Sequence, residues 1–483
     1  MTPTAYGVLV ILIGGFLMAR SIVWMLVLFL VATLFGGASA VDLPLLGGAS
    51  IQPSLLVLVL LGVRLMLAKA VPGRFVGVAF RENALLVGYC LYAAVTAFIL
   101  PRIFFDRIAV IPMATAYLGE QPLNFTSQNI TSAFYLVGTG FAAVAASIVA
   151  QDERSPPIII GTLIFMTWAH ILFGLADLGL SMIHQEKLLM VFKNGHYAML
   201  DQTMNSVHRI GGIMPEPSSY ANYGCVMLVV MTELWVRGIA AKATGLAALA
   251  MLSLIILSTS SSGYVTVAAY GLIMFMRILF IRGAISASKA ATFGLLALAG
   301  AAVVVGVILF DPKAGEGVGD LLNQVLFAKA KSESGVERAK WARQGFDAFA
   351  VSGGFGVGVG SFRSSSLFTA ILGSVGVIGI SLFLGYILQV MKPLRPSTYR
   401  VGIAAPRSLG AAAAWAVLVS LLSAALQSPS SDPGAMFAIL CGLSLAWSVP
   451  ATPSAASATR RAEPRTVGQL QLQRERGVIL GGK

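Results

Sequence analysis

Charged residues are scarce in this chain: only 11% of its 483 residues are Asp, Glu, Lys or Arg, whereas 57% are hydrophobic. A soluble protein of this length needs far more polar surface, and no hydrophilic stretch of domain size interrupts the hydrophobic segments. These segments are nearly continuous and lack the alternation of polar and apolar residues that is typical of a membrane β-barrel. The sequence therefore predicts one integral membrane domain made of helices.

The motifs of several common sites are also missing. The three cysteines, Cys90, Cys225 and Cys441, lie in hydrophobic segments and lack the paired spacing of a disulfide framework or a zinc site. The four histidines lack metal-site spacing as well. No Gly-Lys-Ser/Thr motif and no alternation of strands and helices predicts a nucleotide-binding fold. We therefore expect neither a metal nor a cofactor.

The hydrophobic segments have the length that a membrane-spanning helix needs, which is roughly 20 residues. We expect an all-α polytopic bundle of about 12–13 transmembrane helices in one domain, residues 1–450. Residues 451–483 are rich in Ala, Ser, Thr, Pro and Arg, which predicts a disordered cytoplasmic tail. The candidate spans are residues 6–19, 22–36, 53–69, 83–100, 133–150, 158–180, 219–236, 243–258, 262–280, 290–310, 367–391, 409–426 and 433–449.

Lys and Arg gather in alternate connections between these spans, and such connections are usually cytoplasmic. The opposite, external set includes short connections without Lys or Arg at 258–262 and 427–433, and three long loops at about 101–132, 181–218 and 311–366. Long loops that retain aromatic and aliphatic residues favour ordered, functional structure. The net charge of +13 is then mainly a topology signal, and we expect no nucleic-acid partner. The predicted cytoplasmic residues are Arg20, Lys69, Arg74, Arg81, Arg154, Arg237, Lys242, Arg277, Arg282, Lys289, Lys392, Arg395, Arg400 and Arg407.

Basic residues also occur in the predicted external loops, where they are usually sparse: Arg209, Arg338, Lys340, Arg343 and Arg363. One interpretation is a cationic pocket, because guanidinium groups bind phosphate oxygens through two hydrogen bonds and would suit a lipid diphosphate beside a membrane. The alternative is that long loops escape the charge rule and that nearby acidic residues neutralise the charge. Those acidic residues are Asp311, Glu316, Asp320, Glu333, Glu337 and Asp347.

Two loop segments near these basic residues have recognisable local patterns. The helical spacing of residues 336–346 predicts a helix along the membrane surface. Residues 353–366 are rich in glycine, which allows positive φ, so successive amides could form an anion-binding concavity before the next span. The alternative for the glycine-rich segment is a flexible hinge of small residues.

Two further external elements contain candidate residues. Glu216 lies between two prolines before a span, where a stiff backbone would present its carboxylate at the membrane surface. It could act as a general base, or it could complement the dipole of the following helix. Residues 258–264 form a short connection whose hydroxyl groups could cap helix ends or bind a sugar.

In their order along the chain, these elements resemble the bacterial O-antigen polymerase and O-antigen ligase superfamily, and more closely its exopolysaccharide polymerase branch. The resemblance covers about residues 205–390. It rests on Arg-Ile-Gly-Gly-Ile-Met-Pro-Glu-Pro-Ser-Ser at 209–219, Ser-Thr-Ser-Ser-Ser-Gly-Tyr at 258–264, the set of Glu337, Arg338 and Trp341, Gly-Val-Gly-Val-Gly-Ser-Phe-Arg-Ser-Ser-Ser at 356–366, and Gly-Val-Ile-Gly at 376–379.

The resemblance implies a metal-independent glycosyltransferase of the bacterial inner membrane that joins undecaprenyl-diphosphate-linked oligosaccharides at the periplasmic face. A sugar hydroxyl of one chain would attack the anomeric carbon of another, and the lipid diphosphate would leave. Arg209, Arg338 and Arg363 are expected to neutralise the charge that grows on the diphosphate. Glu216, or in second place His208, is expected to assist the acceptor hydroxyl. The expected substrate-binding residues are Arg343, Lys340, Ser218, Ser261, Gly358, Gly360, Ser361, Ser364 and Ser365.

One departure from the family's pattern bears on the reaction. Many ligases of the family carry a His-Asn pair shortly after the glycine-rich block, whereas this chain has Ser365 and Ser366. This departure favours a polymerase of a surface polysaccharide or exopolysaccharide over a ligase, and it leaves the base open between Glu216 and His208. A flippase and a chain-length regulator are expected as protein partners, beside membrane lipid.

Two alternatives belong to other classes of protein. A transporter or flippase for lipid-linked glycans tends to place its polar residues on broken helices at the membrane midplane, whereas the polar clusters here fall in external loops. A non-catalytic membrane scaffold is the second alternative, because each motif alone is weak.

Overall fold

The structure of the protein is a computed structural model that describes residues 2–43, 49–67, 72–113, 119–195, 203–204, 207–281, 283–310, 333–394 and 405–448. Its helices are α1 (Ala5–Met18), α2 (Ile22–Ala32), α3 (Pro53–Leu67), α4 (Gly73–Glu82), α5 (Ala84–Ile103), α6 (Ser127–Ala150), α7 (Ser155–Met182), the 3-10 helix η2 (Glu186–Phe192), α8 (Pro217–Val236), α9 (Ala241–Leu257), α10 (Ser261–Phe280), α11 (Ala287–Phe310), α13 (Glu333–Val351), α14 (Leu367–Val390), the 3-10 helix η5 (Lys392–Leu394), α15 (Ala405–Gln427) and α16 (Ala435–Ser448).

The predicted all-α, polytopic membrane fold is confirmed. Within the described ranges, six helices are long and apolar enough to cross a membrane, namely α5, α6, α7, α10, α14 and α15, and shorter apolar helices accompany them. Strands are short: β1 (Thr2–Pro3), β2 (Val41–Leu43) and β3 (Ala49–Ile51) form one antiparallel sheet, β4 (Ala109–Val110) pairs with β5 (Gln121–Pro122), and β6 (Thr203–Met204) pairs with β7 (Val207–His208). The predicted tail and the acidic residues Asp311, Glu316 and Asp320 lie outside the described residues.

Two helices differ from the sequence-based expectation. Helix α6 begins at Ser127 rather than near 133, because Thr126 and Asn129 form a capping box that satisfies the first amides. Helix α4 occupies a stretch that was expected to be a basic connection between two spans. It packs Ala79 against Val144 of α6, so its apolar face is buried although the segment is too polar to span a membrane.

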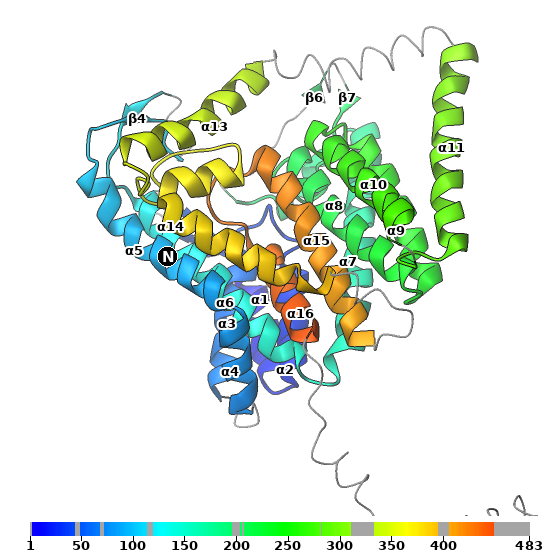
Figure 1. Cartoon of the computed structure of the whole chain (residues 1–483), viewed down its shortest axis with the longest axis horizontal. Coiled ribbons are helices and arrows are strands. Elements are labelled where there is room, and N and C mark those ends of the chain that lie inside the picture. The colour runs from blue at the N-terminus through cyan, green and yellow to red at the C-terminus, as the bar shows by residue number, and fades with distance from the viewer. Residues whose placement is uncertain are drawn as a thin grey trace, which may run out of the picture. The chain divides into compact units, whose positions relative to one another are not determined.

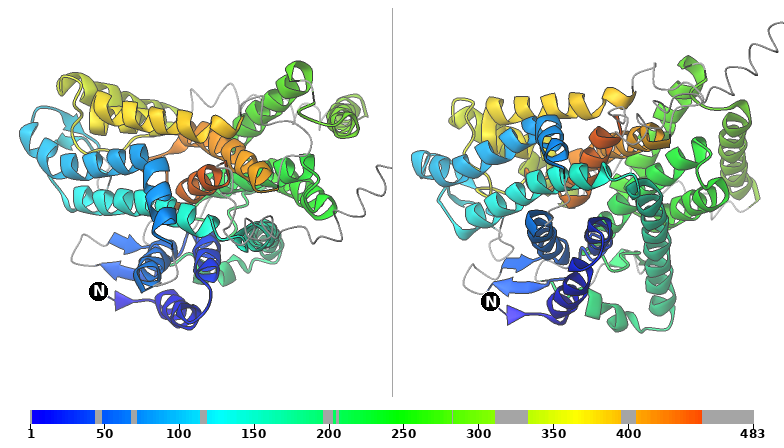
Figure 2. Two further views of the ribbon diagram at one scale, coloured as in Figure 1. Left: turned by 60° about the horizontal axis from the view of Figure 1, so that its bottom comes forward. Right: turned by 90° about the horizontal axis from the view of Figure 1, so that it is seen from below.

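The centre of the bundle consists of α6, α8, α15 and α16, and Figure 2 shows α16, in red, between α6, in cyan, and α15, in orange. Small residues allow close approach here: a side chain on Gly442 of α16 would come within 2.3 Å of the Ala143 carbonyl oxygen on α6. Helices α13 and α14 also lie in close contact, because Gly345 faces Thr369 at a separation that leaves no room for a Cβ. Figure 1 shows α13 together with β4, β6 and β7 along one edge of the bundle.

The C-terminal part of α8 contains a buried ionic network. Glu233 is fully buried and contacts the guanidinium groups of Arg237 and Arg277, and it also accepts a hydrogen bond of 3.0 Å from Tyr270. Arg277, which is expected on the cytoplasmic side, lies in the last turn of α10 rather than in a connection and is only 3% exposed. Arg277 also stacks on Trp415 of α15 at 4.3 Å. Both arginines at this end therefore serve to pair a buried carboxylate.

Candidate functional site

The opposite, N-terminal end of α8 is built by a turn and two prolines. Gly212 has a φ of +53°, which turns the chain before Pro215, and Pro217 occupies the first helical position, where its missing N–H costs nothing. Glu216 is the N-cap residue, but its carboxylate makes no capping hydrogen bond. The carboxylate instead accepts a hydrogen bond from the hydroxyl group of Ser218. Glu216 is thus held half-buried at the start of the helix.

Arg209 is held by the connection between α9 and α10. Its Nε donates to the Thr259 hydroxyl oxygen at 3.2 Å, and one terminal nitrogen donates to the Thr259 carbonyl oxygen at 3.3 Å. Thr259 has a φ of +50°, a conformation that is strained for a β-branched residue. The predicted capping role of this connection is confirmed for Ser260, which caps α10 through Gly263. The same connection therefore has a second role, because Thr259 orients the guanidinium group of Arg209.

Arg363 approaches from the glycine-rich segment. Its guanidinium lies 4.4 Å from the ring centroid of Trp341 on α13, in a cation–π contact, and its backbone amide donates to the Ile111 carbonyl oxygen at 2.8 Å. The Nε atom is buried without a hydrogen-bond partner among the described residues. A buried, unpartnered donor on a cation is costly unless a ligand satisfies it.

Arg338 lies on α13, which the glycine-rich segment fastens in place. The hydroxyl group of Ser365 donates to the Arg338 carbonyl oxygen at 2.6 Å. Arg338 acts electrostatically on both other arginines, and its charge contributes to lowering the pKa of each. Arg209, Arg338, Arg363 and Glu216, which come from three separate segments, are therefore brought together, and we refer to these four residues as the arginine cluster.

The electrostatics of the arginine cluster leave positive charge available. Burial lowers the pKa of Arg209, an effect that Glu216 opposes and Arg338 strengthens. Burial likewise lowers the pKa of Arg363, with Glu216 and Glu337 opposing it and Arg338 strengthening it. Guanidinium groups remain protonated in proteins even so. Among the described residues no carboxylate forms an ion pair with any of the three arginines, so the cluster can accept an anion.

The glycine-rich segment acts as a support for the arginine cluster. The amides of Val357 and Gly358 donate to carbonyl oxygens of α14 at 2.9 and 2.8 Å, beside Gly376, where the helix is kinked. These two amides are therefore not free to bind an anion as the concavity interpretation requires. Gly360 packs against the backbone of Gln128, and Asn129 donates to Ser361 at 3.0 Å. Gly358, Gly360 and Ser361 are buried packing positions next to α5 and α6.

The remaining predicted residues fall into two groups. Ser364 and Ser218 tie the site to the α15–α16 region: the Ser364 amide donates to the Pro429 carbonyl oxygen at 2.9 Å, and Gln427 donates to the Ser218 carbonyl oxygen at 3.4 Å. Ser261 is the half-buried first residue of α10. By contrast, Lys340 pairs with Glu120 at 2.7 Å and Arg343 faces Asp347 at 4.0 Å, with both basic side chains largely exposed. These two are not brought into the arginine cluster by any contact among the described residues.

A contact that the sequence did not reveal connects His208 to α7. Its Nε2 lies 3.3 Å from Oδ1 of Asp177, and the other oxygen of this carboxylate accepts the amides of Gly211 and Gly212. The signal that could have found it is an aspartate inside an apolar segment, which needs internal partners.

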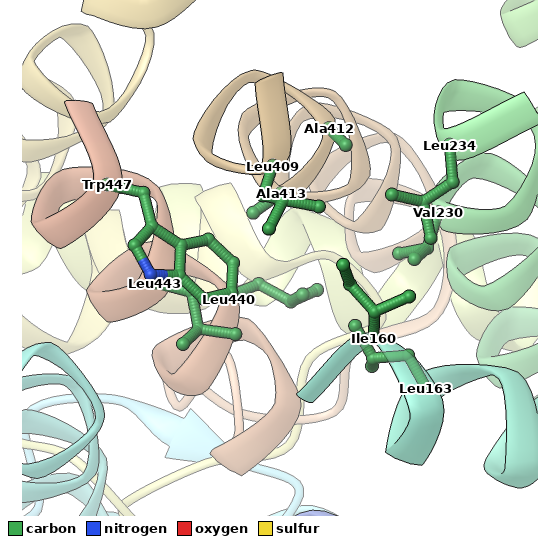
Figure 3. Close-up of a pocket in the computed structure, with 10 residues that line it drawn as sticks. All are labelled: Ile160, Leu163, Val230, Leu234, Leu409, Ala412, Ala413, Leu440, Leu443 and Trp447. Atoms are coloured by element: carbon green, nitrogen blue, oxygen red, sulfur yellow. The ribbon is translucent and has the colours of Figure 1, made fainter. Parts of the chain in front are cut away.

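A small cavity elsewhere in the bundle does not offer a second substrate site. It lies between α7, α8, α15 and α16, has a volume of about 10 Å³, and is lined by aliphatic side chains and Trp447 (Figure 3). A space of this size holds at most one water molecule, and its apolar lining favours an empty cavity.

The arginine cluster is thus a candidate anion-binding site at one end of a helical membrane protein. Searches against protein-family models and against curated proteins give no match to this chain.

Proposed function

We propose that this protein polymerises undecaprenyl-diphosphate-linked oligosaccharide repeat units of a surface polysaccharide or exopolysaccharide at the periplasmic face of a bacterial inner membrane. The observation that carries the proposal is the meeting of Arg209, Arg338 and Arg363 without ion-pair partners among the described residues. A pyrophosphoryl group carries enough negative charge to satisfy such a cluster, and its lipid tail would stay in the bilayer beside it.

The leaving group explains why a cationic site suffices for glycosyl transfer. As the bond between the anomeric carbon and the diphosphate oxygen breaks, negative charge grows on the diphosphate, and fixed guanidinium groups stabilise that charge more than they stabilise the ground state. Arg209 and Arg363 are each fixed by a second contact, to Thr259 and Trp341. Glu216 balances part of the positive charge, because its carboxylate acts electrostatically on both Arg209 and Arg363.

The test is a comparison of glycans from cells that carry the wild-type protein, Arg209→Ala or Arg363→Ala. With membrane levels unchanged, both variants are expected to abolish polymer while single lipid-linked repeat units accumulate. Arg102→Ala is the matched control, because Arg102 is an exposed arginine at the end of α5 that contacts only Phe98 and Phe125 among the described residues. Full-length polymer from both cluster variants would overturn the proposal.

Gel analysis of the same lipid-linked and free glycans distinguishes the alternative activities. A ligase defect leaves long polymer on its lipid carrier, whereas a flippase defect leaves repeat units that added periplasmic enzymes cannot reach. Either outcome in cells lacking the protein would replace the polymerase assignment.

A further inference from the structure

The carboxylate of Asp177 is an unusual feature of α7. It lies in an apolar helix and is only 3% exposed, a position in which an ionised group is costly unless hydrogen bonds compensate. Its Oδ2 accepts the amides of Gly211 at 2.7 Å and Gly212 at 2.9 Å. These bonds fasten the turn that leads from Arg209 to Glu216 onto α7.

The other oxygen of the same carboxylate faces a histidine. Oδ1 of Asp177 lies 3.3 Å from Nε2 of His208, whose side chain is 29% exposed. The two atoms are close, but Nε2 makes no hydrogen bond with any described residue. Lys193 also interacts with this carboxylate: burial lowers the pKa of its ammonium group, and the Asp177 charge opposes that shift. The charged groups around His208 are thus Asp177 from α7, Lys193 from the segment after η2, and Arg209, its neighbour in the chain.

We propose that Asp177 is a positioning residue that makes His208 the base of the transfer reaction. This inference rests on the proposed function. The negative charge of the Asp177 carboxylate 3.3 Å from Nε2 favours the tautomer with its proton on that nitrogen, so Nδ1 keeps a lone pair that can accept a proton. In other enzymes a carboxylate beside one ring nitrogen orients a catalytic histidine in the same way. Contacts of this kind are often loosely aligned without substrate and tighten when it binds.

The contacts of Glu216 support the same choice between the two candidate bases. Its carboxylate already accepts the Ser218 hydroxyl group and lies among the guanidinium groups of the cluster. Such a group serves better as a charge partner than as a proton acceptor. His208 instead directly precedes Arg209 in the chain, and its side chain faces Asp177.

The reaction step then balances as follows. The acceptor hydroxyl oxygen forms a bond to the anomeric carbon of the donor, and its proton passes to Nδ1 of His208. The bond between that carbon and the diphosphate oxygen breaks, and its electron pair leaves with the undecaprenyl diphosphate held by Arg209, Arg338 and Arg363. The imidazolium returns its proton to solvent before the next turnover.

The experiment uses the purified full-length protein in liposomes, with lipid-linked repeat units extracted from cells that lack it. His208→Gln is expected to lower turnover by about 10²–10⁴-fold and to remove the acidic limb of the pH–rate profile. The affinity for undecaprenyl diphosphate should stay within about twofold of wild type, a difference of under 1 kcal/mol, because the three arginines rather than His208 are proposed to hold the diphosphate. Turnover by a His208→Gly variant should recover when imidazole is added. Asp177→Asn retains an oxygen for both glycine amides, and it should displace the acidic limb while keeping binding of the diphosphate.

The controls separate this inference from the proposed function. His184→Asn, at an exposed histidine with a φ of +56° that Asn tolerates, should leave turnover and its pH profile unchanged. Wild-type turnover by His208→Gln, or an acidic limb that survives in it, would overturn the base assignment alone. Absence of transfer by the wild-type protein, with no binding of undecaprenyl diphosphate, would overturn the proposed function itself.

Discussion

Helix α8 (Pro217–Val236) begins beside one set of arginines and ends beside another, about 25 Å away by the rise of a helix. At its C-terminal end, Glu233 is fully buried and contacts both Arg237 and Arg277. At its N-terminal end, Glu216 is half-buried and shares its field with Arg209 and Arg363, neither of which forms an ion pair among the described residues. The same residue types are thus closed into a network at one end and left open at the other.

The difference concerns what each set of charges stabilises. A buried carboxylate with two guanidinium partners is satisfied within the protein, and removing one partner leaves an uncompensated charge in a medium of low dielectric constant. A half-buried group of arginines with spare donors is satisfied only when an anion arrives. Mutations at the first end should therefore change stability, whereas mutations at the second should change activity.

The largest expected effect is at Glu233. Glu233→Ala leaves Arg237 and Arg277 without their carboxylate and should destabilise the fold by about 3–5 kcal/mol. The protein level in the membrane, and the temperature at which the purified protein unfolds, should both fall. Replacing Glu233 and Arg277 together by Met also removes the more deeply buried of the two cations and should restore part of that level, since only Arg237, whose side chain is 13% exposed, is then left without its carboxylate. A single Glu233→Ala variant with wild-type stability would erase the contrast between the two ends.

The next effect tests geometry at the open end. Arg363→Lys keeps the positive charge but loses the planar, two-pronged donor and its stacking on Trp341. We expect transfer to fall by about 10- to 100-fold, as for the loss of one hydrogen bond to a charged group, with the membrane level unchanged. Turnover measured on lipid-linked repeat units gives the result. Equal activity of Arg and Lys at this position would mean that charge alone suffices.

How far the sequence predicts this contrast depends on the range of the contacts. Six of the 12–13 expected spans coincide with described helices that are long and apolar enough to cross a membrane, because apolar length is a local property of the sequence. The three cluster arginines stand out because basic residues are sparse in external loops. The hydrogen bond from Arg209 to Thr259 joins residues 50 positions apart, and no local sequence pattern predicts it. The sequence does not predict the pairing of Glu233 with Arg277 for the same reason, since these residues meet only through the packing of α8 on α10. The sequence also does not predict that amides of the glycine-rich segment bond to α14, because their acceptors lie beside a kink at Gly376 that no local pattern indicates.

A smaller effect is expected where strain and function meet at Thr259. Thr259→Gly removes the strain of a β-branched residue at positive φ and should raise stability by about 1 kcal/mol. It also removes the hydroxyl acceptor for Arg209, which should lower transfer about fivefold to tenfold. Thermal unfolding and turnover of the same preparation should therefore move in opposite directions. Thr259→Ser, which keeps the hydroxyl group, should retain activity, and its failure to do so would dissociate Arg209 from this contact.

The smallest expected effect concerns Asp432, a half-buried carboxylate that forms no ion pair among the described residues, unlike Glu233. It lies between α15 and α16, where Thr139 donates to its Oδ1 at 2.7 Å and the Gly434 amide donates at 2.9 Å. Burial raises the pKa of Asp432 from its ordinary value, and these two hydrogen bonds only partly oppose the shift. Folding therefore favours the protonated form of Asp432. Ionisation costs stability above the raised pKa, and this cost is relieved as the pH falls towards the ordinary pKa of an aspartate.

The variant Asp432→Asn keeps an acceptor for both donors and has no charge to bury. Its stability at neutral pH should therefore equal that of the wild type or exceed it by no more than about 1 kcal/mol. Its unfolding temperature should also lose the part of the pH dependence that separates it from wild type between neutral pH and about pH 4. A destabilised Asp432→Asn variant would instead mean that a cation neutralises the Asp432 carboxylate. Asp432 would then resemble Glu233, whose charge is compensated by cations within the protein.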